Sequence, residues 1–204
     1  MVILVCVMGI GATAQDKTLA LRLYLSPAIC RTFTQYRVLS DGVATLNNLT
    51  KSSGVFFGGG VAVLKNIDEN WLIGGDIGFV SKGDFAIRDS VYHNGGFGGT
   101  SFTREELNFL QTLVFVERQK ELKNKDDKLL FASGIFYGMR FRSLIGYGLD
   151  VKAHDFGTSV SLGIQHRRFF TKIDYQMGLV NIKNAVGSEF KTNILSFKIG
   201  YSVL

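Results

Sequence analysis

Two consecutive segments near the C-terminal end of the chain place the strongest constraint on the fold. Residues 156–165 (FGTSVSLGIQ) and 169–179 (FFTKIDYQMGL) each alternate between two kinds of side chain, and only residues 166–168 separate them. One set of alternate positions is mainly apolar, whereas the other is rich in glycine, hydroxyl, amide and charged residues. A period of two residues is typical of β-strands with unlike faces. Each segment has about ten residues, the length with which a tilted strand crosses a bilayer.

The alternation alone does not say which face is inside. A soluble sandwich turns its apolar face inward, whereas a membrane barrel turns it toward lipid. Glycine weakens a strand and contributes no packing, so its frequency on the polar faces needs a reason. A narrow, crowded lumen supplies one, and we therefore predict that the apolar faces point outward. The glycines in question are Gly58, Gly60, Gly74, Gly78, Gly134, Gly138, Gly157, Gly163, Gly178 and Gly200.

The first residues have the pattern of a secretion signal. Residues 1–14 (MVILVCVMGIGATA) join an apolar stretch to a small-x-small site at Ala12-Thr13-Ala14 and are too short for a spanning helix. We predict a signal peptide over 1–14 and one barrel domain over 15–204. A buried first strand is the alternative, and the missing basic n-region leaves open a start upstream of Met1.

Strand-length alternation recurs eight times, and no later apolar run approaches the length of a membrane helix. We predict an all-β fold, an eight-stranded antiparallel up-and-down transmembrane β-barrel. Long connections (29–54, 83–106) alternate with short ones (65–70, 166–168), as in outer-membrane barrels of Gram-negative bacteria, and an even strand count places both termini in the periplasm. The expected strands are 18–28, 54–64, 71–82, 107–118, 129–141, 156–165, 169–179 and 192–203.

The fourth of these strands has a competing interpretation. Residues 103–106 (TREE) before an apolar run form a capping-box pattern, which would start a helix over 105–127. Residues 113–116 (LVFV) are strong strand formers, and a helix here would leave an odd number of strands. We therefore favour the strand.

Charged residues of both signs fall on the predicted inward faces. An eight-stranded barrel is just wide enough for its own side chains, and an isolated buried ion costs several kcal/mol, so these charges must pair. We predict an ion-paired plug that keeps the barrel rigid; a proton or small-ion path along the same residues is the alternative. The predicted lumen network is Arg22, Asp76, Glu117, Arg140, Asp155, Lys172, Asp174 and Lys198.

Aromatic residues gather near the predicted strand ends, as in the two interfacial girdles of membrane barrels. Chance scatter in an aromatic-rich β protein is the alternative explanation. The predicted girdle residues are Trp71, Phe131, Phe169 and Tyr201 toward the turns, and Phe79, Phe141 and Phe156 toward the loops.

The formal net charge of +6 invites a nucleic-acid partner, but the basic residues form no stripe interleaved with aromatics. We predict no nucleic-acid binding. Several basic residues lie in loops or at strand ends, where they would contact phosphates of outer-membrane lipopolysaccharide. These are Arg31, Arg37, Lys51, Arg142, Lys152, Lys183 and Lys191.

A catalytic role has weak support. The candidate pairs for a lipid-A-modifying enzyme are His93 with Ser90 and His154 with Ser159, yet no Gly-x-Ser-x-Gly motif and no metal-ligand spacing occurs. We predict a protein without catalytic residues, cofactor or metal. The alternatives are a lipid-A-modifying enzyme and a soluble secreted barrel that binds a lipophile.

Several segments carry a resemblance to a known family. They are residues 131–138 (FASGIFYG), 155–157 (DFG), 173–182 (IDYQMGLVNI), 195–201 (LSFKIGY) and 79–83 (FVSKG). These segments resemble the Bacteroidota outer-membrane β-barrel family that includes PorT-like proteins. The resemblance implies a cell-envelope role in contact with outer-membrane lipid and with other envelope proteins, such as an accessory subunit of a secretion or gliding complex.

Overall fold

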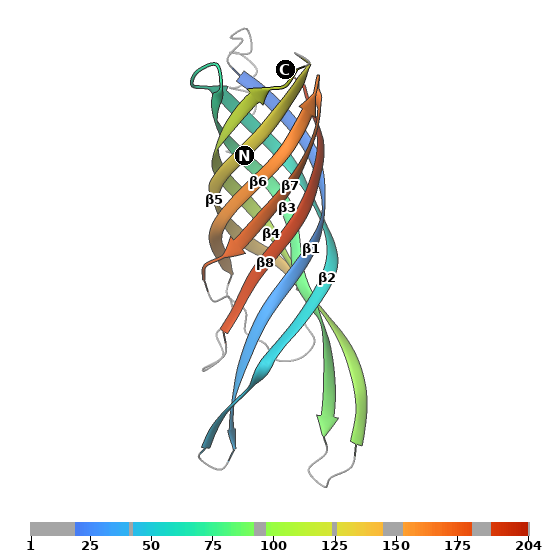
Figure 1. Ribbon diagram of the computed structural model, residues 1–204. Coiled ribbons are helices and arrows are strands. Elements are labelled where there is room, and N and C mark those ends of the chain that lie inside the picture. Colours follow the sequence, from blue (N-terminus) through green and yellow to red (C-terminus); the bar gives the residue numbers. More distant parts are fainter. Residues whose placement is uncertain are drawn as a thin grey trace.

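A computed structural model describes the backbone of residues 19–40, 43–91, 97–123, 126–144, 153–180 and 189–203, and for 31–40, 43–53, 83–91, 97–106, 142–144 and 189–190 it describes the backbone alone. Within these ranges the chain forms eight strands that close into a barrel, each antiparallel to its neighbours (Figure 1). The predicted fold class is confirmed. The strands are β1 (Leu19–Ser40), β2 (Val43–Asn66), β3 (Trp71–Val91), β4 (Phe97–Glu121), β5 (Asp127–Leu144), β6 (His154–His166), β7 (Phe169–Gly178) and β8 (Glu189–Ser202).

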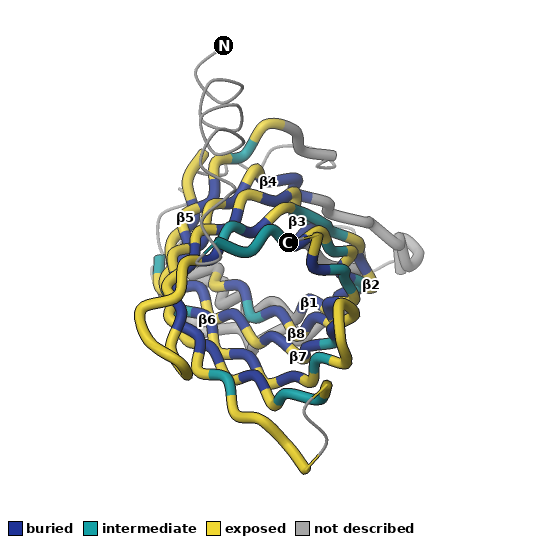
Figure 2. The backbone as a smooth tube through the Cα atoms, turned by 90° about the horizontal axis from the view of Figure 1, so that it is seen from above, coloured by how far each residue is buried: buried dark blue, intermediate teal, exposed yellow. Residues whose placement is uncertain are grey.

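The apolar faces point out of the barrel. Along β7, Ile173 and Tyr175 are 54% and 46% exposed, whereas the intervening Lys172 and Asp174 are buried. Figure 2 shows the same alternation of buried and exposed positions along the other strands. The predicted orientation is therefore confirmed: the outer surface is apolar and the interior carries the polar side chains.

The strands extend well beyond the segments that show alternation. The β1–β2 ladder continues to the pair Ser40–Val43, and the β3–β4 ladder continues to Val91–Phe97. The prediction that 29–54 and 83–106 are long loops is therefore wrong for most of their length. Backbone hydrogen bonding can extend a ladder without an apolar face, and only an apolar face produces the alternating signal. In Figure 1 these two hairpins project beyond the barrel and diverge.

Short turns join the strands at the opposite end. They lie between β2 and β3, between β4 and β5, and between β6 and β7, and the start of β1 and the end of β8 lie at the same end. In the first turn, Asp68 Oδ1 accepts hydrogen bonds from the backbone N–H groups of Asn70 and Trp71, both at 2.8 Å. We call this the turn end of the barrel and the other the loop end.

A register shift interrupts the β4–β5 ladder at the loop-end side of β4. The β4–β5 register shifts between Asn108 and Phe109, and three consecutive residues, Leu107 to Phe109, are buried. A bulge places two residues opposite one, which interrupts the alternation of faces. The helix considered over 105–127 is wrong, because β4 runs to Glu121. No helix of the described part of the chain is long and apolar enough to cross a membrane.

Candidate functional site

The lumen of the barrel is the candidate site, because it gathers the buried charged side chains. Among the described residues these comprise four cations and four acids. They fall into three groups along the barrel axis, which we name the turn-side, central and loop-side groups. The cations are Arg22, Lys82, Lys172 and Lys198, and the acids are Asp76, Glu117, Asp155 and Asp174.

The turn-side group is centred on Glu117, which β4 contributes and which is fully buried. The Nη1 of Arg22 lies 2.9 Å from Glu117 Oε2, and the Nζ of Lys172 donates to the same carboxylate. Arg22 Nη2 also donates to Gln165 Oε1 at 3.0 Å, and Gln119 Nε2 donates to Glu117 at 2.8 Å. One carboxylate thus pairs with two cations, and without its charge both cations would be buried without an acidic partner in this group.

The central group contains two acids that share one lysine. Lys198 Nζ lies 3.3 Å from Asp174 Oδ2 and 3.7 Å from Asp76 Oδ2. The hydroxyl of Tyr24 donates to Asp76 at 2.7 Å, and that of Ser159 donates to Asp174 Oδ1 at 2.6 Å. The excess negative charge of this group offsets the excess positive charge of the turn-side group beside it.

The loop-side group is a fully buried ion pair. Lys82 Nζ lies 2.6 Å from Asp155 Oδ2, and neither side chain is exposed. The ammonium group lies 4.4 Å from the ring centroid of Phe136 and 5.2 Å from that of Phe109. Thr192 Oγ1 donates to the same carboxylate oxygen at 3.3 Å. Aromatic faces therefore stabilise the cation where water is excluded.

Apolar side chains fill the remaining space inside the barrel. Phenylalanine rings occupy inward positions that sequence patterning marked as polar, and glycines on neighbouring strands make room for them. A Cβ at Gly157, for example, would lie 2.6 Å from the Phe136 ring. Among the side chains that the structure describes, two buried apolar clusters result, one of Ala62, Leu64, Leu72, Leu113, Phe115, Ala132 and Phe136, and one of Ala28, Cys30, Phe56 and Ile194.

The structure brings seven of the eight predicted lumen residues into these three groups; Arg140 is half-buried and is not among the residues joined by the ion pairs above. Sequence reasoning left out Lys82 and Tyr24. Both lie at even-numbered positions of strands whose even positions point inward, together with Asp76 in β3 and Arg22 in β1. Tyr24 was expected on the inward face but is uncharged, and extending the alternation of faces to the last residue of the 71–82 segment would have found Lys82.

The predicted girdle residues lie on the outer surface near the two ends of the barrel. Phe169 and Tyr201 pack edge to face at the turn end, with ring centroids 5.1 Å apart. Phe79 and Phe141 pair across strands toward the loop end, at 5.8 Å. The guanidinium of Arg118 lies over Trp71, with its Cζ 5.6 Å from the centroid of the ring. Phe131 and Phe156 are also exposed, at 49% and 40%.

The predicted lipopolysaccharide contacts fall largely where little is described. Lys191 is exposed near the start of β8. Only the backbone is described at Arg31, Arg37, Lys51 and Arg142, and all four lie on the loop-end side of their strands. Lys152 and Lys183 lie outside the described residues, as does the predicted signal peptide.

The histidine–serine pair considered for catalysis is not assembled. His154 lies on the outer face, where its Nδ1 and the Tyr137 hydroxyl are 2.6 Å apart, whereas Ser159 points inward to Asp174. His93 lies outside the described residues. Within the described residues, no group of His, Cys, Asp and Glu side chains is arranged to hold a metal ion.

Comparisons with known proteins support the fold. No model of a known protein family matches the chain, and none of the curated proteins is detectably similar. Among solved structures, the chain is similar to the outer membrane protein OprG from Pseudomonas aeruginosa, with a TM-score of 0.55 and 10% identity over 92% of this chain and 98% of that one. Neisserial surface protein A also matches, with a TM-score of 0.47 and 9% identity over 88% and 96% of the two chains. The likeness to OprG concerns the fold alone.

Proposed function

We propose that this protein is an integral β-barrel of a Gram-negative outer membrane with a structural or interaction role and no catalytic one. The observation that carries the proposal is that the apolar and polar faces are reversed relative to a soluble protein. Leucine, isoleucine, valine and phenylalanine side chains cover the outside of the barrel, and ion pairs lie inside it. Soluble proteins rarely expose a continuous apolar surface of this kind, and a bilayer is the solvent that it fits.

The two alternatives fit the geometry less well. A soluble barrel that carries a lipophile needs an apolar interior and a polar exterior, which is the reverse of the arrangement here. A lipid-modifying enzyme needs a nucleophile within hydrogen-bonding reach of a base. Ser159 and His154 lie on opposite sides of the barrel wall.

The finer parts of the proposal concern orientation and partners. The turn end, where β1 begins and β8 ends, faces the periplasm. The projecting hairpins face the outside of the cell. Short turns and long outer segments have these orientations in outer-membrane barrels. The exposed aromatic residues near both ends form the interfacial girdles. The basic residues at the loop end contact lipopolysaccharide phosphates, and the protein serves as an accessory subunit of an envelope complex. Residues 1–14 act as the secretion signal.

Fractionation of cells that express the protein tests the proposal. We expect it in the outer membrane, with a folded form that migrates differently on SDS gels before and after heating. Recovery of folded protein from the soluble periplasmic fraction would overturn the assignment.

A substitution series tests the lipopolysaccharide contact separately. Replacing Arg31, Arg37, Lys51 and Arg142 with Gln should reduce the lipopolysaccharide that copurifies. The matched control replaces Lys65, Lys120 and Lys123, which are exposed at the turn end, and should leave retention unchanged. Equal retention in both sets would exclude a contact made by the loop-end residues.

A further inference from the structure

The barrel wall has a weak point between β2 and β3. Their ladder ends at the pair Gly58–Val80, while β2 remains paired with β1 and β3 with β4 far beyond that level. Figure 1 shows the two hairpins separating from this point. Next to it, β2 carries three consecutive glycines, residues 58–60, so the wall here lacks side chains on both faces.

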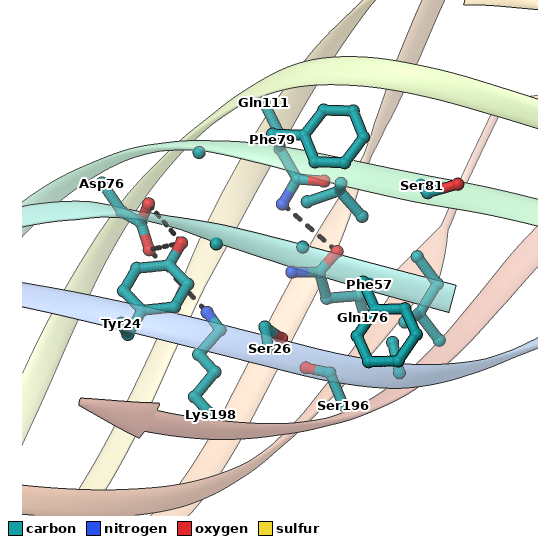
Figure 3. Close-up of a pocket in the computed structure, with 16 residues that line it drawn as sticks. Tyr24, Ser26, Phe57, Asp76, Phe79, Ser81, Gln111, Gln176, Ser196 and Lys198 are labelled. Atoms are coloured by element: carbon teal, nitrogen blue, oxygen red, sulfur yellow. Dashed lines mark hydrogen bonds and ion pairs between the residues drawn. The ribbon is translucent and has the colours of Figure 1, made fainter. Parts of the chain in front are cut away.

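A small cavity of about 20 Å³ lies at this point and is lined by both faces of the wall (Figure 3). Phe57 and Phe79, which are 69% and 39% exposed on the outer surface, form one side. The other side is formed by lumen residues of five strands: Tyr24, Ser26, Asp76, Gln111, Gln176, Ser196 and Lys198. The cavity therefore lies in the wall, between apolar side chains of the outer surface and polar side chains of the lumen.

One hydrogen-bond acceptor at this cavity is unsatisfied. Gln176 Nε2 donates to Asp174 Oδ2 at 3.1 Å, so the Gln176 carbonyl faces Gln111 and accepts its Nε2 at 3.2 Å. This chain fixes the orientation of both amides. The Oε1 of Gln111 is left buried without a hydrogen-bond partner among the described residues. Leaving a buried acceptor unpaired is unfavourable, so a donor at this position is favoured.

We propose that the place where the β2–β3 ladder ends, beside Phe57 and Phe79, admits one small donor group, the hydroxyl or primary amine of a membrane amphiphile, which donates to Gln111 Oε1. The alkyl chain stays outside along the apolar wall. A volume of about 20 Å³ fits a group the size of one water molecule and excludes a phosphate headgroup. The inference rests on the proposed membrane location, because the tail needs lipid around the barrel.

Side-chain amide signals in NMR spectra report binding directly. The full chain, labelled with 15N and reconstituted in phosphatidylcholine nanodiscs, is titrated with 1-dodecanol and, separately, with dodecane. We expect dodecanol to shift the Gln111 and Gln176 side-chain amide signals with saturation, and dodecane to leave them unchanged. Gln111→Leu removes the acceptor and should raise the half-saturating dodecanol fraction at least tenfold, as followed at the Gln176 amide.

Filling the cavity gives an independent test. Ser196→Leu should abolish the dodecanol response, whereas Ser161→Leu, in a second lumen cavity of about 30 Å³, should leave it intact. If Ser196→Leu does not fold, Ser26→Val fills the same cavity with a smaller side chain.

Equal responses to dodecanol and dodecane, or no response from protein that is heat-modifiable and inserted, would mean that the cavity holds only water. That result overturns the inference and leaves the proposed membrane location standing, whereas failure to insert contradicts the location itself.

Discussion

Glu117 shows how a single buried charge organises the lumen. Its carboxylate accepts from both Arg22 and Lys172 and is entirely shielded from solvent. A buried ion pair adds little net stability compared with apolar packing, but removing one partner leaves an uncompensated charge in a low-dielectric environment. In this case the loss would leave two buried cations close together.

We expect Glu117→Gln to lower the free energy of unfolding by about 3–5 kcal/mol, because glutamine keeps the shape and removes the charge. Urea unfolding from lipid vesicles measures the change. The control is Asp126→Asn, which breaks the exposed pair with Arg167, at 3.1 Å, and should cost less than about 1 kcal/mol. Equal costs for the two variants would contradict the role given to Glu117.

Gly157 and Gly75 provide a matched pair for the packing of the lumen. A Cβ at Gly157 would meet the Met177 carbonyl oxygen and lie 2.6 Å from the Phe136 ring, whereas one at Gly75 on the outer face meets nothing within 4 Å. Gly157→Ala should therefore destabilise the barrel by about 1–3 kcal/mol, the usual cost of overpacking a core. Gly75→Ala should be neutral or stabilising, since alanine restricts the unfolded chain. The same urea titration distinguishes the two, and a Gly157→Ala protein as stable as the wild type would show that the lumen has room to spare.

At the scale of elements, the longer strands have two parts that differ in how many neighbouring strands pair with them. Within the barrel each strand pairs on both sides, and its apolar face contacts the surroundings. Beyond the pair Gly83–Glu106, β3 and β4 form a two-stranded ribbon. Such ribbons contribute little independent stability, so folding of the barrel does not depend on them.

Replacing residues 84–105 with Asn-Gly should leave a heat-modifiable barrel, because the ladder up to Gly83–Glu106 remains and the dipeptide forms a tight hairpin turn. Deleting Thr112 alone, in the middle of β4, should prevent folding, since a shift of one residue turns the following side chains to the opposite face. Gel mobility before and after heating reports both results. A truncated protein that fails to fold would show that the ribbon is part of the folding unit.

The whole molecule is a barrel whose exterior suits lipid and whose interior is closed by ion pairs and aromatic rings. Four cations and four acids are present among the buried lumen residues that the structure describes, so these buried charges balance one another. The cavities of about 20 and 30 Å³ each have room for one group the size of a water molecule and are too small for a column of water.

Val160→Arg tests the lipid-facing surface. Val160 is 46% exposed near the middle of β6, where a charge facing lipid costs about 2–4 kcal/mol. Ile67→Arg, in the turn between β2 and β3, is 62% exposed and should cost about 0–1 kcal/mol because it lies at the interface. Folding into lipid vesicles measures both. Similar costs at the two sites would contradict the membrane orientation.

Planar bilayers test the closure of the lumen. The wild-type barrel should insert without steady conductance steps, because aromatic rings and buried ion pairs fill its bore. Lys82→Ala combined with Asp155→Ala and Phe136→Ala removes the loop-side pair together with a ring beside it and should raise the frequency of openings. Regular conductance steps from the wild-type protein would contradict a closed lumen.

The sequence by itself determined the fold class and the eight crossing segments, because a lipid-facing strand must alternate between apolar and polar residues. The glycines on the polar faces then determined which face points into the narrow lumen. Leu162 and Ile164, for example, were predicted to face outward and are exposed. The tertiary structure decided what the pattern does not encode: the ribbon extensions, the bulge at Asn108 and the pairing of Lys82 with Asp155. Closure of the barrel brings together residues that are far apart in sequence. Ion-pair partners and glycine–aromatic contacts therefore depend on strand register and shear. The alternation along one strand shows only whether a side chain points inward.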